Sequence, residues 1–183
     1  MIYDLSLRTA GLCAGIFLVL VSLPGLLQPG GTKAVLVKLP RSRVLGIFLL
    51  TAAFVWSFWL LATMEMGEFS SFRRPLMFGL PVGYVLVMRF VGEFLAVRAL
   101  GILALLAGEP LLEAAFLRYE TSRLYVTVLA YLLIVAGLFW VTVPYVLRDQ
   151  ISWTTRSNAR WIALHVVGFF YGAVILALAL TRY

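Results

Sequence analysis

Six ionisable side chains stand in otherwise apolar stretches of this sequence and could carry chemistry. Five of them fall within residues 75–118, and the sixth is the only histidine of the chain. Ionisable groups at membrane depth are costly to bury and therefore often mark a functional site. The six residues are Arg89, Glu93, Arg98, Glu109, Glu113 and His165.

The carboxylates Glu109 and Glu113 are the strongest candidates for an ion or proton site. On a helix over 95–117, Arg98 and Glu109 share one side with two glycines, and Glu113 lies about 60° away. Pro110 releases a backbone carbonyl nearby, and broken helices of this kind can line ion sites. The alternative interpretation places Glu113 at the outer headgroup level, paired with Arg118 or Arg123.

The remaining ionisable groups favour structural roles. Arg89 and Glu93 are four residues apart, which predicts a structural ion pair. His165 shares a helical stripe with Gly168 and Gly172, so it could be a proton-relay group or a histidine that hydrogen-bonds a neighbouring helix. A single histidine makes a haem or zinc site within this chain improbable.

Sequence motifs of several common enzyme classes are absent. The sequence has no G-x-x-x-x-G-K-[ST], no H-E-x-x-H and no G-x-S-x-G. We therefore expect no enzyme activity, no bound metal and no cofactor. The only cysteine is Cys13, which excludes an intrachain disulfide.

Composition defines the class of protein. Hydrophobic residues make up 63% of the 183 residues and charged residues only 13%, with a mean hydropathy of +1.01. A soluble domain is closer to half apolar and a quarter charged. We expect an all-α, polytopic integral membrane bundle that forms one domain over residues 1–183. The net charge is +7, and the basic residues lie mostly between apolar segments. This placement favours a role in membrane orientation and in contact with anionic lipid headgroups over binding of nucleic acid.

Apolar runs predict about six membrane spans, with five as the alternative. A helix of about 20 residues crosses the hydrocarbon core, and the third predicted span is shorter than that. Its prolines, Pro75 and Pro81, further weaken a regular helix, and we expect Pro144 to kink the last turn of the fifth span. The predicted spans are 7–27, 44–63, 76–88, 95–117, 124–147 and 161–180.

The threading of residues 75–118 decides the span count. As one long bent helix it leaves Arg89 and Glu93 near the bilayer centre, and as a re-entrant loop it returns to its starting side. As a hairpin with a turn at 89–94, it moves both charges to the interface, and we prefer this interpretation. The hairpin also gathers nine basic residues on one side: Lys33, Lys38, Arg41, Arg43, Arg89, Arg98, Arg148, Arg156 and Arg160.

Positive charge is enriched in cytoplasmic loops, so this side is expected to face the cytoplasm and both termini to face away from it. The basic segments at 28–43 and 148–160 are interpreted as loops. We expect the chain to reside in a bacterial inner membrane.

Three pairs of glycines at i, i+4 predict faces for close helix packing. They are Gly11 and Gly15, Gly79 and Gly83, and Gly168 and Gly172. Three such faces are more close-packing surface than the few helices of this chain obviously need among themselves. We therefore expect a structural or accessory subunit of a membrane assembly, or a homo-oligomer. The alternative function is a small proton- or cation-coupled transporter or channel that uses Glu109 and Glu113.

Overall fold

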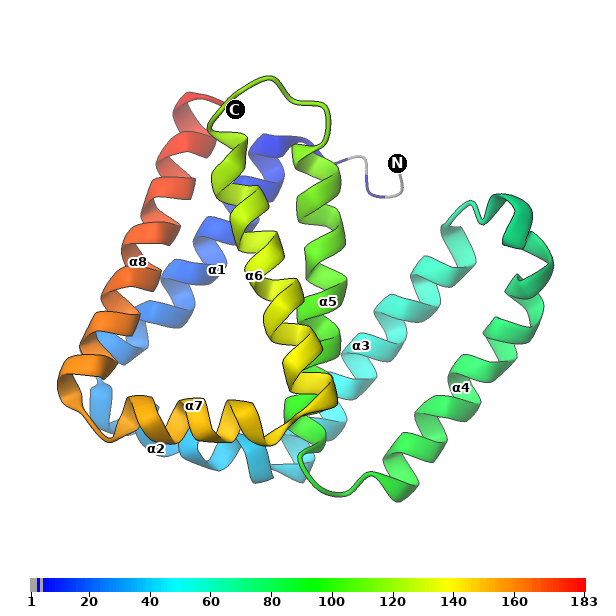
Figure 1. The fold of residues 1–183 in the computed structure, drawn as a ribbon, viewed down its shortest axis with the longest axis horizontal. Coiled ribbons are helices and arrows are strands. Elements are labelled where there is room, and N and C mark those ends of the chain that lie inside the picture. The colour runs from blue at the N-terminus through cyan, green and yellow to red at the C-terminus, as the bar shows by residue number, and fades with distance from the viewer. Residues whose placement is uncertain (1–2, 4) are drawn as a thin grey trace.

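The computed structural model describes residues 3 and 5–183, and this part of the chain forms eight α-helices and two short 3-10 helices. Figure 1 shows helices that run up and down between two ends of the molecule, together with two helices that lie across one end. The helix bounds are α1 Leu7–Leu27, α2 Pro29–Lys38, α3 Arg43–Thr63, α4 Arg73–Phe90, α5 Leu95–Ala115, α6 Arg123–Thr142, α7 Tyr145–Thr155 and α8 Asn158–Thr181, with the 3-10 helices Leu39–Arg41 and Gly67–Phe72.

Five of the described helices, α1, α3, α5, α6 and α8, are long and apolar enough to cross a membrane. Each has 20 to 24 residues, which at 1.5 Å per residue matches a hydrocarbon core of about 30 Å. An all-helical bundle satisfies every backbone polar group within its own segments, as a lipid environment requires. The predicted membrane-helical fold class is confirmed.

The core lies where α1, α5, α6 and α8 meet. Its fully buried side chains include Val126 of α6 and Ile175 of α8. The closest pairings are α1 with α8 and α5 with α6, and in both pairs the two helices run antiparallel (Figure 1). The first and last described helices are therefore neighbours, and the start of α1 and the end of α8 lie at the same end of the molecule.

The stretch 75–118 forms two helices rather than one. α4 ends at Phe90 and α5 begins at Leu95, and Phe94 adopts a left-handed backbone with φ of 55° in the turn between them. α4 runs back along α3 from one end of the molecule to the other (Figure 1), which agrees with the hairpin and not with a re-entrant loop.

α4 is not among the five candidate spans, because arginines limit its apolar part. Arg73 and Arg74 begin the helix and Arg89 stands near its end. The stretch between them, 75–88, is about 21 Å long at helical rise. Pro81 lies inside α4 without ending it.

The two basic segments expected to be loops are helices instead. Pro29 occupies the first turn of α2, where its missing N–H costs nothing. The side chain of Thr32 donates to the carbonyls of Pro24 and Gln28 at 3.0 and 2.9 Å, and so joins α2 to the end of α1.

The predicted span 124–147 was wrong at its end. α6 stops at Thr142, and Pro144 caps a separate helix, α7, that runs across the end of the bundle (Figure 1). Proline lacks the N–H that the next helical hydrogen bond needs, so it ends the span instead of kinking its last turn.

Candidate functional site

The carboxylates Glu109 and Glu113 lie one turn apart near the end of α5, next to the amino-terminal segment. Glu109 is exposed, whereas Glu113 is half-buried and accepts a hydrogen bond from the backbone N–H of Tyr3 at 3.3 Å. The Tyr3 hydroxyl in turn accepts a hydrogen bond from Nε1 of Trp56 at 2.7 Å, and its ring packs 5.6 Å from the ring of Trp59. Tyr3 therefore joins α5 to the far end of α3.

The ionisation of Tyr3 reflects this position. Burial raises the pKa of the Tyr3 hydroxyl, and the negative charges of Glu109 and Glu113 raise this pKa further, against the hydrogen bond from Trp56 that lowers it. Tyr3 is consequently a neutral phenol at physiological pH. The geometry gives Glu113 a role in holding the amino-terminal segment and leaves Glu109 open to protons or cations from this end.

His165 lies in a tight contact between α1 and α8. Its side chain is 8% exposed, its Nδ1 lies 2.8 Å from the carbonyl oxygen of Trp161, and its ring stacks 4.1 Å from the indole of Trp161. The carbonyl belongs to its own helix. The neighbouring helix contributes Gly25, which has no side chain at the place that the imidazole occupies.

Trp161 completes this contact, which we call the Gly25–Trp161–His165 cluster. Residue 29 is a proline, so no backbone N–H is available to close the helical hydrogen bond to the Gly25 carbonyl. Nε1 of Trp161 donates to this carbonyl at 2.7 Å instead. Lys33 lies 5.4 Å above the Trp161 ring and donates a hydrogen bond to Oδ1 of Asn158. The cluster explains His165 as an interhelical packing residue.

Arg89, Glu93 and Arg98 lie at the other end of the molecule, around the turn between α4 and α5. Arg89 is exposed near the end of α4 and Glu93 is exposed within the turn, and among the described residues no ion pair joins them. Arg98 is partly buried in the first turn of α5, and its Nε has no hydrogen-bond partner within the described residues.

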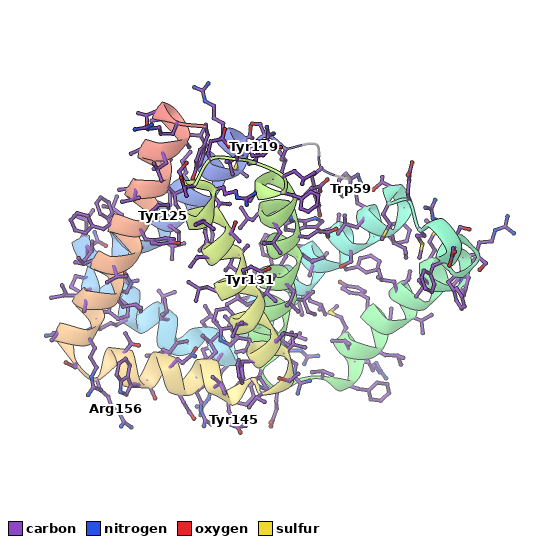
Figure 2. The ribbon with its side chains drawn as sticks, turned by 45° about the horizontal axis from the view of Figure 1, so that its top comes forward. Trp59, Tyr119, Tyr125, Tyr131, Tyr145 and Arg156 are labelled. Carbon is purple, nitrogen blue, oxygen red and sulfur yellow. The ribbon has the colours of Figure 1, made fainter. Side chains whose placement is uncertain are left out.

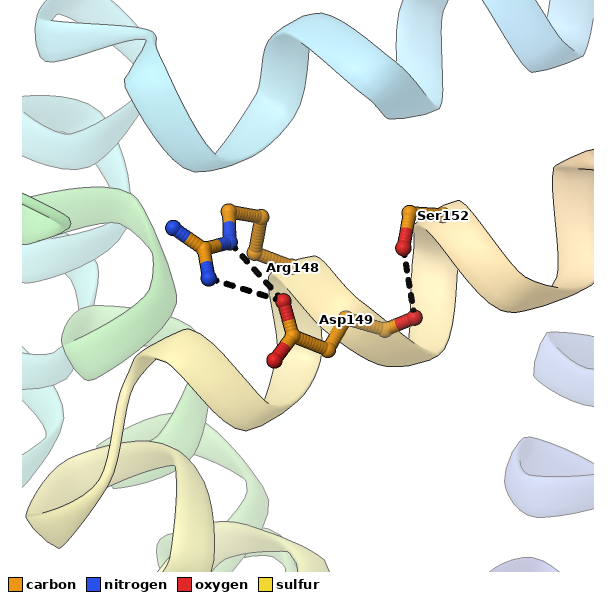
Figure 3. Close-up of polar contacts among 3 residues, drawn as sticks. All are labelled: Arg148, Asp149 and Ser152. Atoms are coloured by element: carbon orange, nitrogen blue, oxygen red, sulfur yellow. Dashed lines mark hydrogen bonds and ion pairs between the residues drawn. The ribbon is translucent and has the colours of Figure 1, made fainter.

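Within the described part of the chain, an ion pair joins the neighbouring residues Arg148 and Asp149 on α7. Nε and Nη2 of Arg148 both lie 2.9 Å from Oδ1 of Asp149, and Ser152 donates to the Asp149 carbonyl (Figure 3). The two charged side chains are 48% and 58% exposed, so the pair contributes little to stability.

Two of the three glycine pairs pack against each other. A methyl group at Gly15 would lie 2.9 Å from the carbonyl oxygen of Gly172, and one at Gly172 would lie 3.0 Å from that of Gly15. Gly11 faces Ala179, and Gly168 faces Ser22. These four glycines thus form the α1–α8 interface inside one chain.

The third pair, Gly79 and Gly83, is open. A methyl group at either position would have no atom within 4 Å. α4 has no buried residue, and it packs against α3 and the adjoining 3-10 helix.

Sequence patterns did not predict the contacts of Tyr3 with Glu113 and Trp56, nor the hydrogen bond from Trp161 to Gly25. One signal was available, since a proline four residues after Gly25 leaves a carbonyl that needs another donor. Within the described residues, no group of three or more His, Cys, Asp or Glu side chains could hold a metal ion. Comparison of the chain with protein-family models, with curated proteins and with solved structures finds no match.

Proposed function

We propose that this chain is an integral structural or accessory subunit of a membrane assembly, which packs through α4 against a second copy or a different membrane protein. The observation that carries the proposal is α4 itself, a helix without buried residues whose Gly79 and Gly83 are open. The other two glycine pairs are already used between α1 and α8.

The length of α4 supports a protein neighbour over lipid alone. Its apolar part is about 21 Å long, shorter than a hydrocarbon core of about 30 Å. A short apolar helix is accommodated by thinning the bilayer or by association with another protein. Small residues on its surface permit close backbone approach, which is how membrane helices associate.

Cysteine crosslinking in native membranes tests this proposal. In a Cys13→Ser background, Gly83→Cys is expected to give a crosslinked species under mild oxidation, and its mass distinguishes a homodimer from a heteromeric complex. The matched control is Leu20→Cys, an exposed position of α1 that is 61% accessible and is expected to remain uncrosslinked. A protein that stays monomeric by native mass spectrometry and is never crosslinked at residue 83 would refute the proposal.

We further propose a bacterial inner-membrane location with the end formed by α2 and α7 in the cytoplasm. A helical bundle suits that membrane, and the excess of basic residues at this end follows the positive-inside rule. Impermeant thiol labelling of cells and of inverted vesicles tests the orientation. Lys38→Cys and Arg156→Cys should be labelled from the same side, and Arg118→Cys from the opposite side.

A further inference from the structure

The helices α2 and α7 form one surface across an end of the bundle. They lie side by side where the spanning helices end (Figure 1). Leu36 of α2 and Leu39 pack against the buried side chains of Leu147 and Ile151 on α7. The hydrogen bond from Lys33 to Asn158 ties α2 to the first residue of α8. Both helices are therefore fixed parts of the fold.

This surface, which we call the basic end, carries most of the positive charge. Its acidic residues are Glu93 and Asp149, and Asp149 is already paired with its neighbour Arg148. Figure 2 shows Arg156 beside the turn from α7 to α8. The basic residues of α2, α7 and the adjoining helix ends are Lys33, Lys38, Arg41, Arg43, Arg89, Arg98, Arg148, Arg156 and Arg160.

Apolar side chains stand among these charges. Val35 of α2 is 67% exposed and Trp153 of α7 is 58% exposed. The guanidinium of Arg160 lies 4.4 Å from the Trp153 ring. Helices that combine exposed apolar residues with basic ones lie in the interface of a bilayer, with the apolar groups toward the acyl chains and the cations at the phosphates. Tryptophan prefers the same depth.

Arg98 provides a separate observation at this depth. It is the fourth residue of α5, and its buried Nε has no acceptor within the described residues. A buried donor without an acceptor is costly, and the Arg98 guanidinium that carries it adds a positive charge at the level where α5 begins.

We propose that the basic end, with Arg98 at its edge, is a binding surface for anionic phospholipid headgroups. The placement of α2 and α7 at headgroup depth favours lipid over an acidic protein, because the exposed valine and tryptophan side chains need acyl chains as neighbours. This binding does not depend on what packs against α4.

Native mass spectrometry of delipidated protein tests the proposal by titration with phosphatidylglycerol and, in parallel, phosphatidylcholine. Lys38, Arg41 and Arg156 are exposed, and within the described part of the chain their side chains make no hydrogen bond. Each basic group near an anionic surface is worth about a fivefold gain in affinity. The triple variant Lys38→Gln, Arg41→Gln, Arg156→Gln should therefore lose preference for phosphatidylglycerol by on the order of a hundredfold.

The matched control removes the same charge from the opposite end. Arg8, Arg118 and Arg182 are likewise exposed, and their triple glutamine variant should retain the preference. The double variant Arg41→Lys, Arg156→Lys should also retain the preference for phosphatidylglycerol, which separates the loss of charge from a loss of folding.

Three results would overturn the proposal. They are equal binding of the two lipids by the wild type, an equal loss of preference in both triple glutamine variants, and displacement of phosphatidylglycerol by inorganic phosphate at the same concentration. Tighter binding of an acidic peptide than of the lipid would also overturn it, in favour of a protein partner.

Discussion

Substitution of Gly25 by alanine should destabilise the fold through the Gly25–Trp161–His165 cluster. The added methyl group would lie 2.7 Å from Cγ of His165 and closer still to Cδ2 and Nε2. The ring cannot simply withdraw, because it is 8% exposed, stacks on Trp161 and has its Nδ1 2.8 Å from the Trp161 carbonyl.

The size of the effect follows from three contributions. Overpacking a tight interior costs about 1–3 kcal/mol. Displacing the ring forfeits a hydrogen bond worth about 0.5–1.5 kcal/mol. Alanine in a helix returns about 0.5–1 kcal/mol relative to glycine. The expected net loss in the free energy of unfolding is about 2 kcal/mol, within a range of about 0.5–4 kcal/mol, measured by equilibrium unfolding in mixed micelles with increasing SDS.

Two controls make this prediction specific. Gly31→Ala on α2 places the same methyl group where no atom of a neighbouring element lies within 4 Å, so it should be neutral or stabilising by up to about 1 kcal/mol. The double variant Gly25→Ala, His165→Ala should be destabilised by less than the sum of the single variants, by about 1 kcal/mol or more. Equal stability of the Gly25→Ala and Gly31→Ala proteins, or strict additivity in the double variant, would refute the reasoning.

Three further predictions concern single side chains. Trp161→Phe removes the donor to the Gly25 carbonyl and should cost about 1–3 kcal/mol in the same unfolding assay. Trp153→Phe, at an exposed position, should cost less than about 0.5 kcal/mol. Similar losses in both variants would contradict a stabilising role for the Gly25–Trp161–His165 cluster. Because the pKa of Tyr3 is raised in the fold, its stabilising contribution should be complete below about pH 10 and be lost as pH rises through the folded value. The difference in phenolate absorbance between the wild type and Tyr3→Phe should titrate above pH 10. A midpoint at or below 10 would be inconsistent with the burial of Tyr3. Proton flux into proteoliposomes should be the same for wild type and Glu109→Gln if the chain is a structural subunit, and a flux that the substitution abolishes would favour the transporter alternative.

Most bounds of α1, α3 and α8 were predictable from sequence because an apolar run of the right length has few structural alternatives in lipid, whereas the predicted span 76–88 is not among the five candidate spans. The observed α1 has the predicted bounds, and α3 and α8 differ from theirs by up to three residues at an end. The turn at 89–94 was also predictable, because burying Arg89 and Glu93 in one long helix would have been costly.

The helices across the basic end were not predictable in the same way. α2 begins with Pro-Gly-Gly, a combination that is typical of a loop, and it forms where Thr32 and Lys33 bond to neighbouring elements. The apolar run of α6 continues past Pro144 in the sequence, so the first residues of α7 were predicted to belong to the same span. In α2 tertiary contacts override local propensity, whereas α6 ends where Pro144 interrupts its hydrogen bonds.

Side-chain partners depended on tertiary placement in the same way. The spacing of Arg89 and Glu93 suits an ion pair only on a continuous helix, and the helix ends between them. Tyr3 lies far from Glu113 in sequence, and nothing in its surroundings indicates that its N–H meets this carboxylate.

The pairing of the glycine faces changes what the chain requires from a partner. Three open faces would have left the direction of assembly undetermined. Because the glycine faces of α1 and α8 pack against each other, these two helices form one interface within the chain, and their close-packing surface is not open to an oligomer. The opening that remains is on α4, which is also the helix whose apolar part is too short to match the bilayer. Packing and length therefore independently support the proposal that α4 is the helix that a partner would contact.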